Sequence, residues 1–232
     1  MIKEFCTDSG GRIGAEFLDQ FPRGRPPRPF PRAATARTMR AMSHASPSSS
    51  APSPSSGPAA SRLVVPILVG ALVAVALGAY GRVHDPSFGS IPTLGFSSVL
   101  VMKSALATVA LGLALVQVVS ALRMYGRIGS GPASRTVTRI HRTSGVLAVL
   151  VTLPVAYACL WGIGFETLTT RVLVHSLLGC GFYGFFVAKM LTLKTKRVPG
   201  WALPWLGGLT FAALVGIWLT SALWYFTTGS SY

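Results

Sequence analysis

Acidic residues are scarce in this sequence. Asp and Glu together number 6 against 21 Lys and Arg, and charged residues make up only 12% of the 232-residue chain. An average soluble domain carries about 25% charged residues. Half of the residues here are apolar. A water-exposed surface therefore cannot cover most of this chain, and a lipid bilayer is its expected surroundings.

Cysteine is also rare, and its placement excludes several classes of site. The chain has only Cys6, Cys159 and Cys180, which show neither a metal-ligand spacing nor a disulfide framework. The GSGP stretch at 129–132 follows the end of an apolar run and is typical of a loop rather than a phosphate cradle. No hydrolase or transferase motif is present, so at most an electron-transfer component is predicted.

The basic residues do not form one cluster. Eight of them precede residue 62, and most of the others lie between apolar runs. A nucleic-acid binder would gather them into a patch or stripe. The distribution instead indicates membrane topology, and no nucleic-acid partner is predicted.

Residues 1–61 differ in composition from the rest of the chain. They hold nine of the sixteen prolines, eight of them within the stretches RGRPPRPFPR and SPSSSAPSPSSGP. Such a segment buries too little apolar surface to offset its ordering entropy, which predicts a disordered cytoplasmic tail. A start of translation at Met39 or Met42 would explain the same composition. Residues 62–232 are expected to form the membrane domain.

Five apolar runs follow the tail. Each is close to the roughly 20 residues that a helix needs to cross about 30 Å of hydrocarbon. Because the bilayer core offers no water to the backbone, each run must satisfy its own hydrogen bonds as a helix. The predicted fold class is therefore all-α, an integral membrane bundle of five transmembrane helices at about 63–81, 97–122, 143–162, 171–192 and 201–227.

Charge in the connecting loops predicts the orientation. The second and fourth loops hold most of the basic residues, whereas the first and third hold only Arg82 and Arg171. Cytoplasmic loops carry the excess of Lys and Arg. The N-terminus is therefore expected inside and the C-terminus outside, in a multi-pass protein of the plasma membrane. The basic residues of the second and fourth loops are Arg123, Arg127, Arg135, Arg139, Arg142, Lys194, Lys196 and Arg197, with Lys189 just before the last three.

Three ionisable residues inside the apolar runs are candidates for function. They are Lys103, His175 and His141, the last at the inner end of the third helix, and His84 in the first outer loop is a fourth candidate. Ionisable groups at membrane depth are functional candidates by default. Each histidine is followed four residues later by a glycine, Gly145 or Gly179, on the same helix face. A flat macrocycle could lie against such a patch, and histidine is a usual ligand of haem iron. The pattern predicts haem b, with His141 and His175 as ligands of its iron.

The two histidines are expected at different depths. Folding the third and fourth helices back at residue 166 places His175 level with residue 157, about 24 Å from His141. Each histidine therefore needs its own partner. Met190 is expected opposite His141. Cys159, with Tyr157 and Ala158, is expected to face His175, and Lys103, Gly179 and His84 are expected nearby, so that the outer set borders one cavity.

Several segments resemble an uncharacterised family of actinobacterial multi-pass membrane proteins. They are MKSALATVALGLALVQVVSALRMYGR, HRTSGVLAVLVTLPVAYACLWGIGF, TRVLVHSLLGCGFYGFFVAKML and VPGWALPWLGGLTFAALVGIWLTSALWYF, and the resemblance covers about residues 90–228. More remotely, the bundle resembles the cytochrome b561 and ferric-reductase class, which implies electron movement between haems. The sequence departs from that class because its second and fifth helices contain no histidine. The resemblance also implies a histidine within AYACL, where Ala158 stands.

Three functions remain open. The first is a b-type haem or quinone-linked transmembrane electron-transfer subunit, acting with other membrane redox subunits or as a homo-oligomer. The second is a non-catalytic scaffold or accessory subunit with structural histidines, because glycines and alanines in the helices also serve packing. The third is a small transporter, which is disfavoured because no Asp or Glu lies inside a predicted span.

Overall fold

The structure is a computed structural model that describes residues 59–87 and 91–228. The tail predicted for residues 1–61 lies outside the described residues, apart from its last three. Within the described ranges the chain is entirely helical, which confirms the predicted class. It contains five helical spans long and apolar enough to cross a membrane.

The five spans follow one another as predicted. The first is α3 (Val64–Val83), which follows the short 3-10 turn η1 (Ala59–Leu63). The second is α4 (Val99–Met124), and the third is α5 (Arg135–Tyr157), which continues as a π-helical turn, η2 (Ala158–Ile163). The fourth is α6 (Thr170–Lys194). The fifth is α7 (Ala202–Trp218), which runs through a second π-helical turn, η3 (Leu219–Leu223), into α8 (Trp224–Thr228).

Side-chain caps set the starts of three helices. The hydroxyls of Ser98, Ser134 and Thr169 each accept a hydrogen bond from the backbone N–H three residues later. The cap at Ser134 starts α5 well before the predicted residue 143, because the helix extends past its apolar run into the basic segment. His141 therefore lies in the second turn of α5, whereas the predicted helix began two residues after it.

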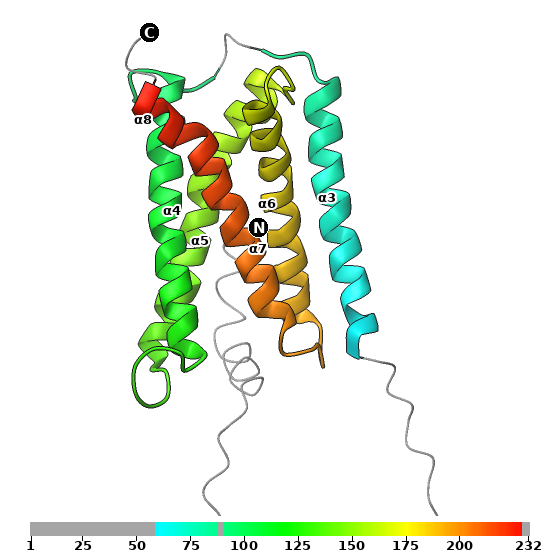
Figure 1. Ribbon diagram of the computed structural model, residues 1–232, viewed down its shortest axis with the longest axis vertical. Coiled ribbons are helices and arrows are strands. Elements are labelled where there is room, and N and C mark those ends of the chain that lie inside the picture. The colour runs from blue at the N-terminus through cyan, green and yellow to red at the C-terminus, as the bar shows by residue number, and fades with distance from the viewer. Residues whose placement is uncertain (1–58, 88–90, 229–232) are drawn as a thin grey trace, which may run out of the picture. The chain divides into compact units, whose positions relative to one another are not determined.

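The helices pack in pairs that are joined through α7. Among the described helices, α4 packs along α5, α3 packs along α6, and α7 packs along α6 and also contacts α4. Figure 1 shows α4 and α3 at opposite edges of the bundle, with α7 crossing in front. The consecutive helices α5 and α6 are not among the pairs that pack along each other.

The contact between α3 and α6 depends on glycine. A Cβ built on Gly184 would lie 2.6 Å from the carbonyl oxygen of Gly70, and one on Gly70 would lie 2.5 Å from the carbonyl oxygen of Gly184. Real Cβ atoms do not approach backbone so closely, so both positions require glycine. Small residues allow this approach in membranes, where packing rather than hydrophobicity drives helix association.

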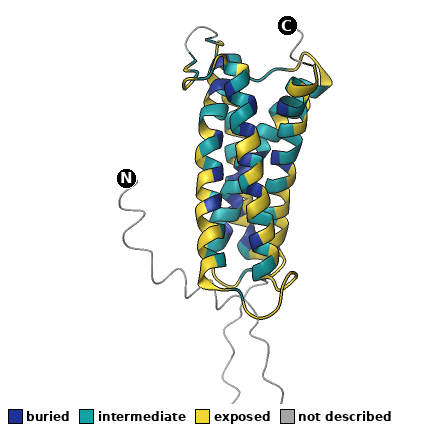
Figure 2. Ribbon diagram, turned by 90° about the vertical axis from the view of Figure 1, so that its left-hand side faces the viewer, coloured by how far each residue is buried: buried dark blue, intermediate teal, exposed yellow. Residues whose placement is uncertain are grey.

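The outward faces of the helices are apolar and exposed. Figure 2 shows exposed residues along the outside of the bundle and buried residues on the inward faces. On α3, for example, Val65 and Leu72 are each 66% exposed. The buried core is built mostly from small residues, including Ala110 and Ala213. This is the reverse of a soluble bundle and suits a lipid solvent.

The two ends of the bundle differ in charge. We call the end that contains segments 84–98 and 164–169 the cavity end, for the reason given below. The opposite end, with segments 125–134 and 195–201, is the basic end, because Arg127, Lys196 and Arg197 lie there. In Figure 1 the cavity end is at the top and the basic end at the bottom.

A candidate ligand cavity

A cavity of about 320 Å³ lies between the helices at the cavity end. Every span contributes to its wall, from Leu77 of α3 to Trp224 of α8, and most of the lining side chains are apolar. Its volume falls within the range of roughly 300 to 1,000 Å³ that is usual for small-molecule sites. Among the predicted site residues, His175, Lys103 and Gly179 line this cavity.

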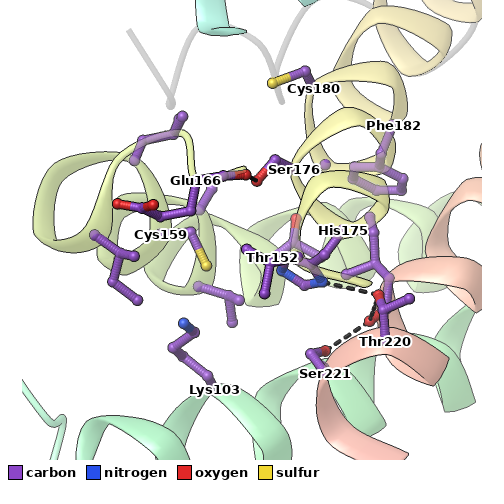
Figure 3. Close-up of a pocket in the computed structure, with 18 of the residues that line it drawn as sticks. Lys103, Thr152, Cys159, Glu166, His175, Ser176, Cys180, Phe182, Thr220 and Ser221 are labelled. Carbon is purple, nitrogen blue, oxygen red and sulfur yellow. Dashed lines mark hydrogen bonds between the residues drawn. The ribbon is translucent and has the colours of Figure 1, made fainter. Parts of the chain in front are cut away.

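His175 enters the cavity with a defined hydrogen-bond arrangement. Its Nδ1 lies 3.0 Å from the hydroxyl oxygen of Thr220. When that hydroxyl donates its single proton to the carbonyl of Gly216, 2.7 Å away, it accepts a hydrogen bond from the imidazole. Nδ1 therefore carries the imidazole proton and Nε2 carries a lone pair. In Figure 3 the second ring nitrogen lies on the side turned away from Thr220, toward Cys159.

The π-helical turn η3 holds this arrangement in place. Arg171, in the first turn of α6, donates from Nη1 to the carbonyl oxygen of Thr220 at 2.7 Å. Its guanidinium carbon lies 4.0 Å from the centre of the Trp224 ring, which is close enough for a cation–π contact. Arg171 thus ties the start of α6 to the residue that orients His175. π-Helical turns are often found at functional sites.

The stretch where α5 continues as η2 presents only one of its faces to the cavity. Cys159 lines it, together with Val155 of α5. Tyr157 and Ala158 do not, although both were predicted to face His175. Tyr157 is 45% exposed and Ala158 is fully buried elsewhere, because the lining residues of this stretch recur every three to four positions along one helix face, which residues 157 and 158 do not share.

Gly179 provides a flat part of the wall. A Cβ built there would meet no atom within 4 Å, so its face of α6 is open. One turn further along α6, the hydroxyl of Tyr183 donates to Thr152 of α5, 3.2 Å from its carbonyl oxygen and 3.0 Å from its hydroxyl. This bond joins α5 to α6 below the cavity. The prediction that residues near 157 lie level with His175 is consistent with this register.

Lys103 lies across the cavity from α6. It belongs to the second turn of α4, and Figure 3 shows its side chain directed into the space below Cys159. Glu166, which precedes α6, also lines the cavity, as does Arg171. The cavity wall thus carries two cationic side chains, one acid and one imidazole.

His141 has quite different surroundings. Its Nδ1 lies 2.8 Å from the hydroxyl of Ser120, which itself donates to the carbonyl of Val116 at 2.6 Å. The side-chain amide of Gln117 donates to the backbone carbonyl of His141. It also fills the space beside Gly145, because a Cβ added at Gly145 would lie 3.0 Å from Nε2 of Gln117. The expected flat patch at Gly145 is therefore occupied by Gln117.

Met190 and His84 also lie away from the cavity. Met190 is half-buried on α6 and does not line it, and neither does His141. The ring of His84 packs with two aromatic rings, stacked on Tyr80 at a centroid distance of 5.1 Å and tilted against Trp161 at 4.3 Å. The structure thus brings together His175, Lys103 and Gly179, and leaves His141, Gly145 and Met190 elsewhere.

Sequence reasoning missed Thr220, Arg171 and Glu166. Two signals could have pointed to them: a Thr-Ser pair inside an otherwise apolar run, and a basic residue at the poorly charged end of the bundle. Neither signal specifies a contact, because Thr220 reaches His175 only through the packing of α7 against α6.

Comparison with known proteins gives the family. No curated protein and no solved structure matches the chain. A family model described as a family of unknown function, DUF6529, matches residues 63–231. This stretch includes all five spans and every residue that lines the cavity. The chain therefore belongs to the DUF6529 family.

Proposed function

We propose that the protein is a membrane electron-transfer subunit that binds one b-type haem in the cavity, with His175 as an axial ligand of the iron. The observation that carries the proposal is the Nε2 lone pair of His175, which faces an apolar cavity while Thr220 holds Nδ1. Metal-bound histidines usually donate their other ring N–H to such a partner.

The same lone pair discriminates between haem and an oxidised quinone. A quinone carbonyl needs a hydrogen-bond donor, whereas Nε2 offers an acceptor. The open face at Gly179 and the apolar wall suit a flat macrocycle, and Lys103 and Arg171 suit its acidic groups. When bound, the haem would supply reversible one-electron chemistry. Thr220 and Arg171 would orient His175, and the surrounding helices would exclude water.

The experiment is an absorption spectrum of the detergent-purified protein, first oxidised and then reduced with dithionite. A Soret band that shifts and sharpens on reduction is expected, with a pyridine haemochrome that reports haem b. A colourless protein that also fails to bind added haemin would exclude the proposal. Recovery of a quinone in place of haem from an organic extract would exclude the haem and retain only the electron-transfer class.

A second candidate function is a non-catalytic scaffold. One observation favours it: His141 and His175 each bond to a hydroxyl on a neighbouring helix, so both could be structural. In that case His175→Ala and Thr220→Val should lower the melting temperature in detergent by similar amounts. Neither of these two variants would contain a chromophore.

The orientation with the N-terminus inside and the C-terminus outside belongs to the proposal, as does the plasma membrane. It rests on the arginines and lysines of the basic end and places the cavity at the outer side. The test introduces Asp85→Cys or Arg127→Cys, one at a time, into a chain whose own cysteines are replaced. Intact cells are then treated with an impermeant thiol reagent. Labelling at 85 but not at 127 is expected, and the reverse would overturn the orientation.

A further inference from the structure

Two cations on the cavity wall have no acidic partner. Lys103 of α4 and Arg171 of α6 both line it. The residues that the structure describes offer Lys103 no hydrogen bond and form no ion pair with Arg171. Glu166 lines the same cavity without pairing with either. Unpaired charge is costly in an apolar setting, which favours a ligand that brings the opposite charge.

Arg171 is already fixed for binding. One of its five N–H donors bonds to the carbonyl of Thr220 at 2.7 Å, and its guanidinium lies over Trp224. The remaining donors form a planar fork, which matches a carboxylate in two parallel hydrogen bonds. Little side-chain entropy remains to be lost when an acid binds, because the Thr220 and Trp224 contacts already restrict the side chain.

Two helix ends add to the positive potential. The starts of α4 and α6 both lie at the cavity end, and Leu100 and Val172 of their first turns line the cavity. The exposed N–H groups at a helix start carry partial positive charge. Lys103 and Arg171 lie close to these two starts in the sequence, so four sources of positive potential lie at the cavity end.

We infer that Lys103 and Arg171 form a carboxylate-binding site at the cavity end, so that the ligand carries its acidic groups along one edge and its apolar body along the Gly179 wall. The inference rests on the proposed function, because a b-type haem is an apolar macrocycle with two carboxylates on one edge. The inference adds the orientation of such a macrocycle, whose carboxylates would point toward the outer side of the membrane.

The test uses iron-free protoporphyrin IX and its dimethyl ester as fluorescent probes of the full-length protein in detergent. Neither contains iron, so His175 cannot contribute by coordination. The free acid is expected to bind about tenfold more tightly than the ester, as for one charge-assisted hydrogen bond. Arg171→Gln and Lys103→Gln should each reduce this preference, while Arg82→Gln, at the same end on the exposed face of α3, should leave it unchanged.

Lys103→Gln provides a second variant if Arg171→Gln fails to fold, because Lys103 makes no hydrogen bond or ion pair with the described residues. Equal binding of acid and ester by the unaltered protein would overturn the inference, and so would a failure to bind either porphyrin. An acid preference that depends on Lys103, in a protein that binds no haem, would sustain the inference and overturn the proposed function. His175→Ala should weaken haem binding but not the acid preference.

Discussion

His141 and His175 have similar hydrogen-bond arrangements but different surroundings. Each imidazole donates from Nδ1 to a hydroxyl on a neighbouring helix, and each hydroxyl donates onward to its own helix backbone. Beside His141 the space is filled by Gln117, whereas His175 faces a cavity of about 320 Å³. A fixed tautomer is therefore common to both histidines, and open volume is what distinguishes the candidate site.

The same contrast exists along α6 alone. Gly184 packs closely against Gly70, whereas a Cβ built on Gly179 would meet no atom within 4 Å. One glycine serves packing and the other serves the cavity. The distinction depends on which helix faces each glycine, and that is a property of the tertiary structure.

The largest effect is expected from adding a methyl group at the packed glycine. Gly184→Ala would place Cβ 2.6 Å from a backbone carbonyl of α3 and should destabilise the protein by about 2 kcal/mol through overpacking. Gly179→Ala is the matched control on the same helix and should be neutral or slightly stabilising. Melting temperatures in detergent would measure both. Similar losses at the two positions would remove the distinction between a packed and an open face.

The next effect concerns the hydroxyl partners of the two histidines. Thr220→Val removes the acceptor that fixes Nδ1 and should weaken haem binding about tenfold, the usual cost of losing such a partner. Ser120→Ala makes the equivalent change at His141 and should leave haem affinity unchanged. Titration of the apoproteins with haemin gives both values. Equal weakening of haem binding by the two variants would mean that the cavity end and the basic end do not differ in function.

The smallest effect is expected at the floor of the cavity. Tyr183→Phe removes the hydrogen bond to Thr152 and should cost about 1 kcal/mol of stability. Tyr157→Phe, on an exposed ring of α5, should cost almost nothing. Thermal unfolding compares them directly. If Tyr183→Phe were also without effect, the bond between α5 and α6 would not be what closes the cavity.

Much of the fold could be predicted from the sequence, because the bilayer leaves few choices. A run of about 20 apolar residues can only cross as a helix, and five such runs gave five spans. The start of α5 could not be placed, because the cap at Ser134 is a local hydrogen bond beyond the apolar run. Hydropathy reports where lipid begins rather than where a helix begins.

The candidate site could be predicted only in part. Spacing and depth were sufficient to group His175 with Lys103 and Gly179, since these follow from helix rise and the fold-back at residue 166. The facing residues were misplaced at Tyr157 and Ala158, because a shared depth does not tell which face of the helix turns toward His175. Thr220 was not foreseen because it depends on the packing of α7 against α6.

The most direct test of the central claim compares the two histidines by one substitution each. His175→Ala and His141→Ala are purified in parallel with the unaltered protein, and the Soret absorbance per protein is measured. We expect His175→Ala to lose the chromophore and His141→Ala to retain most of it, because only His175 presents its Nε2 lone pair to the cavity. Loss in His141→Ala with retention in His175→Ala would contradict the assignment of the site to the cavity end.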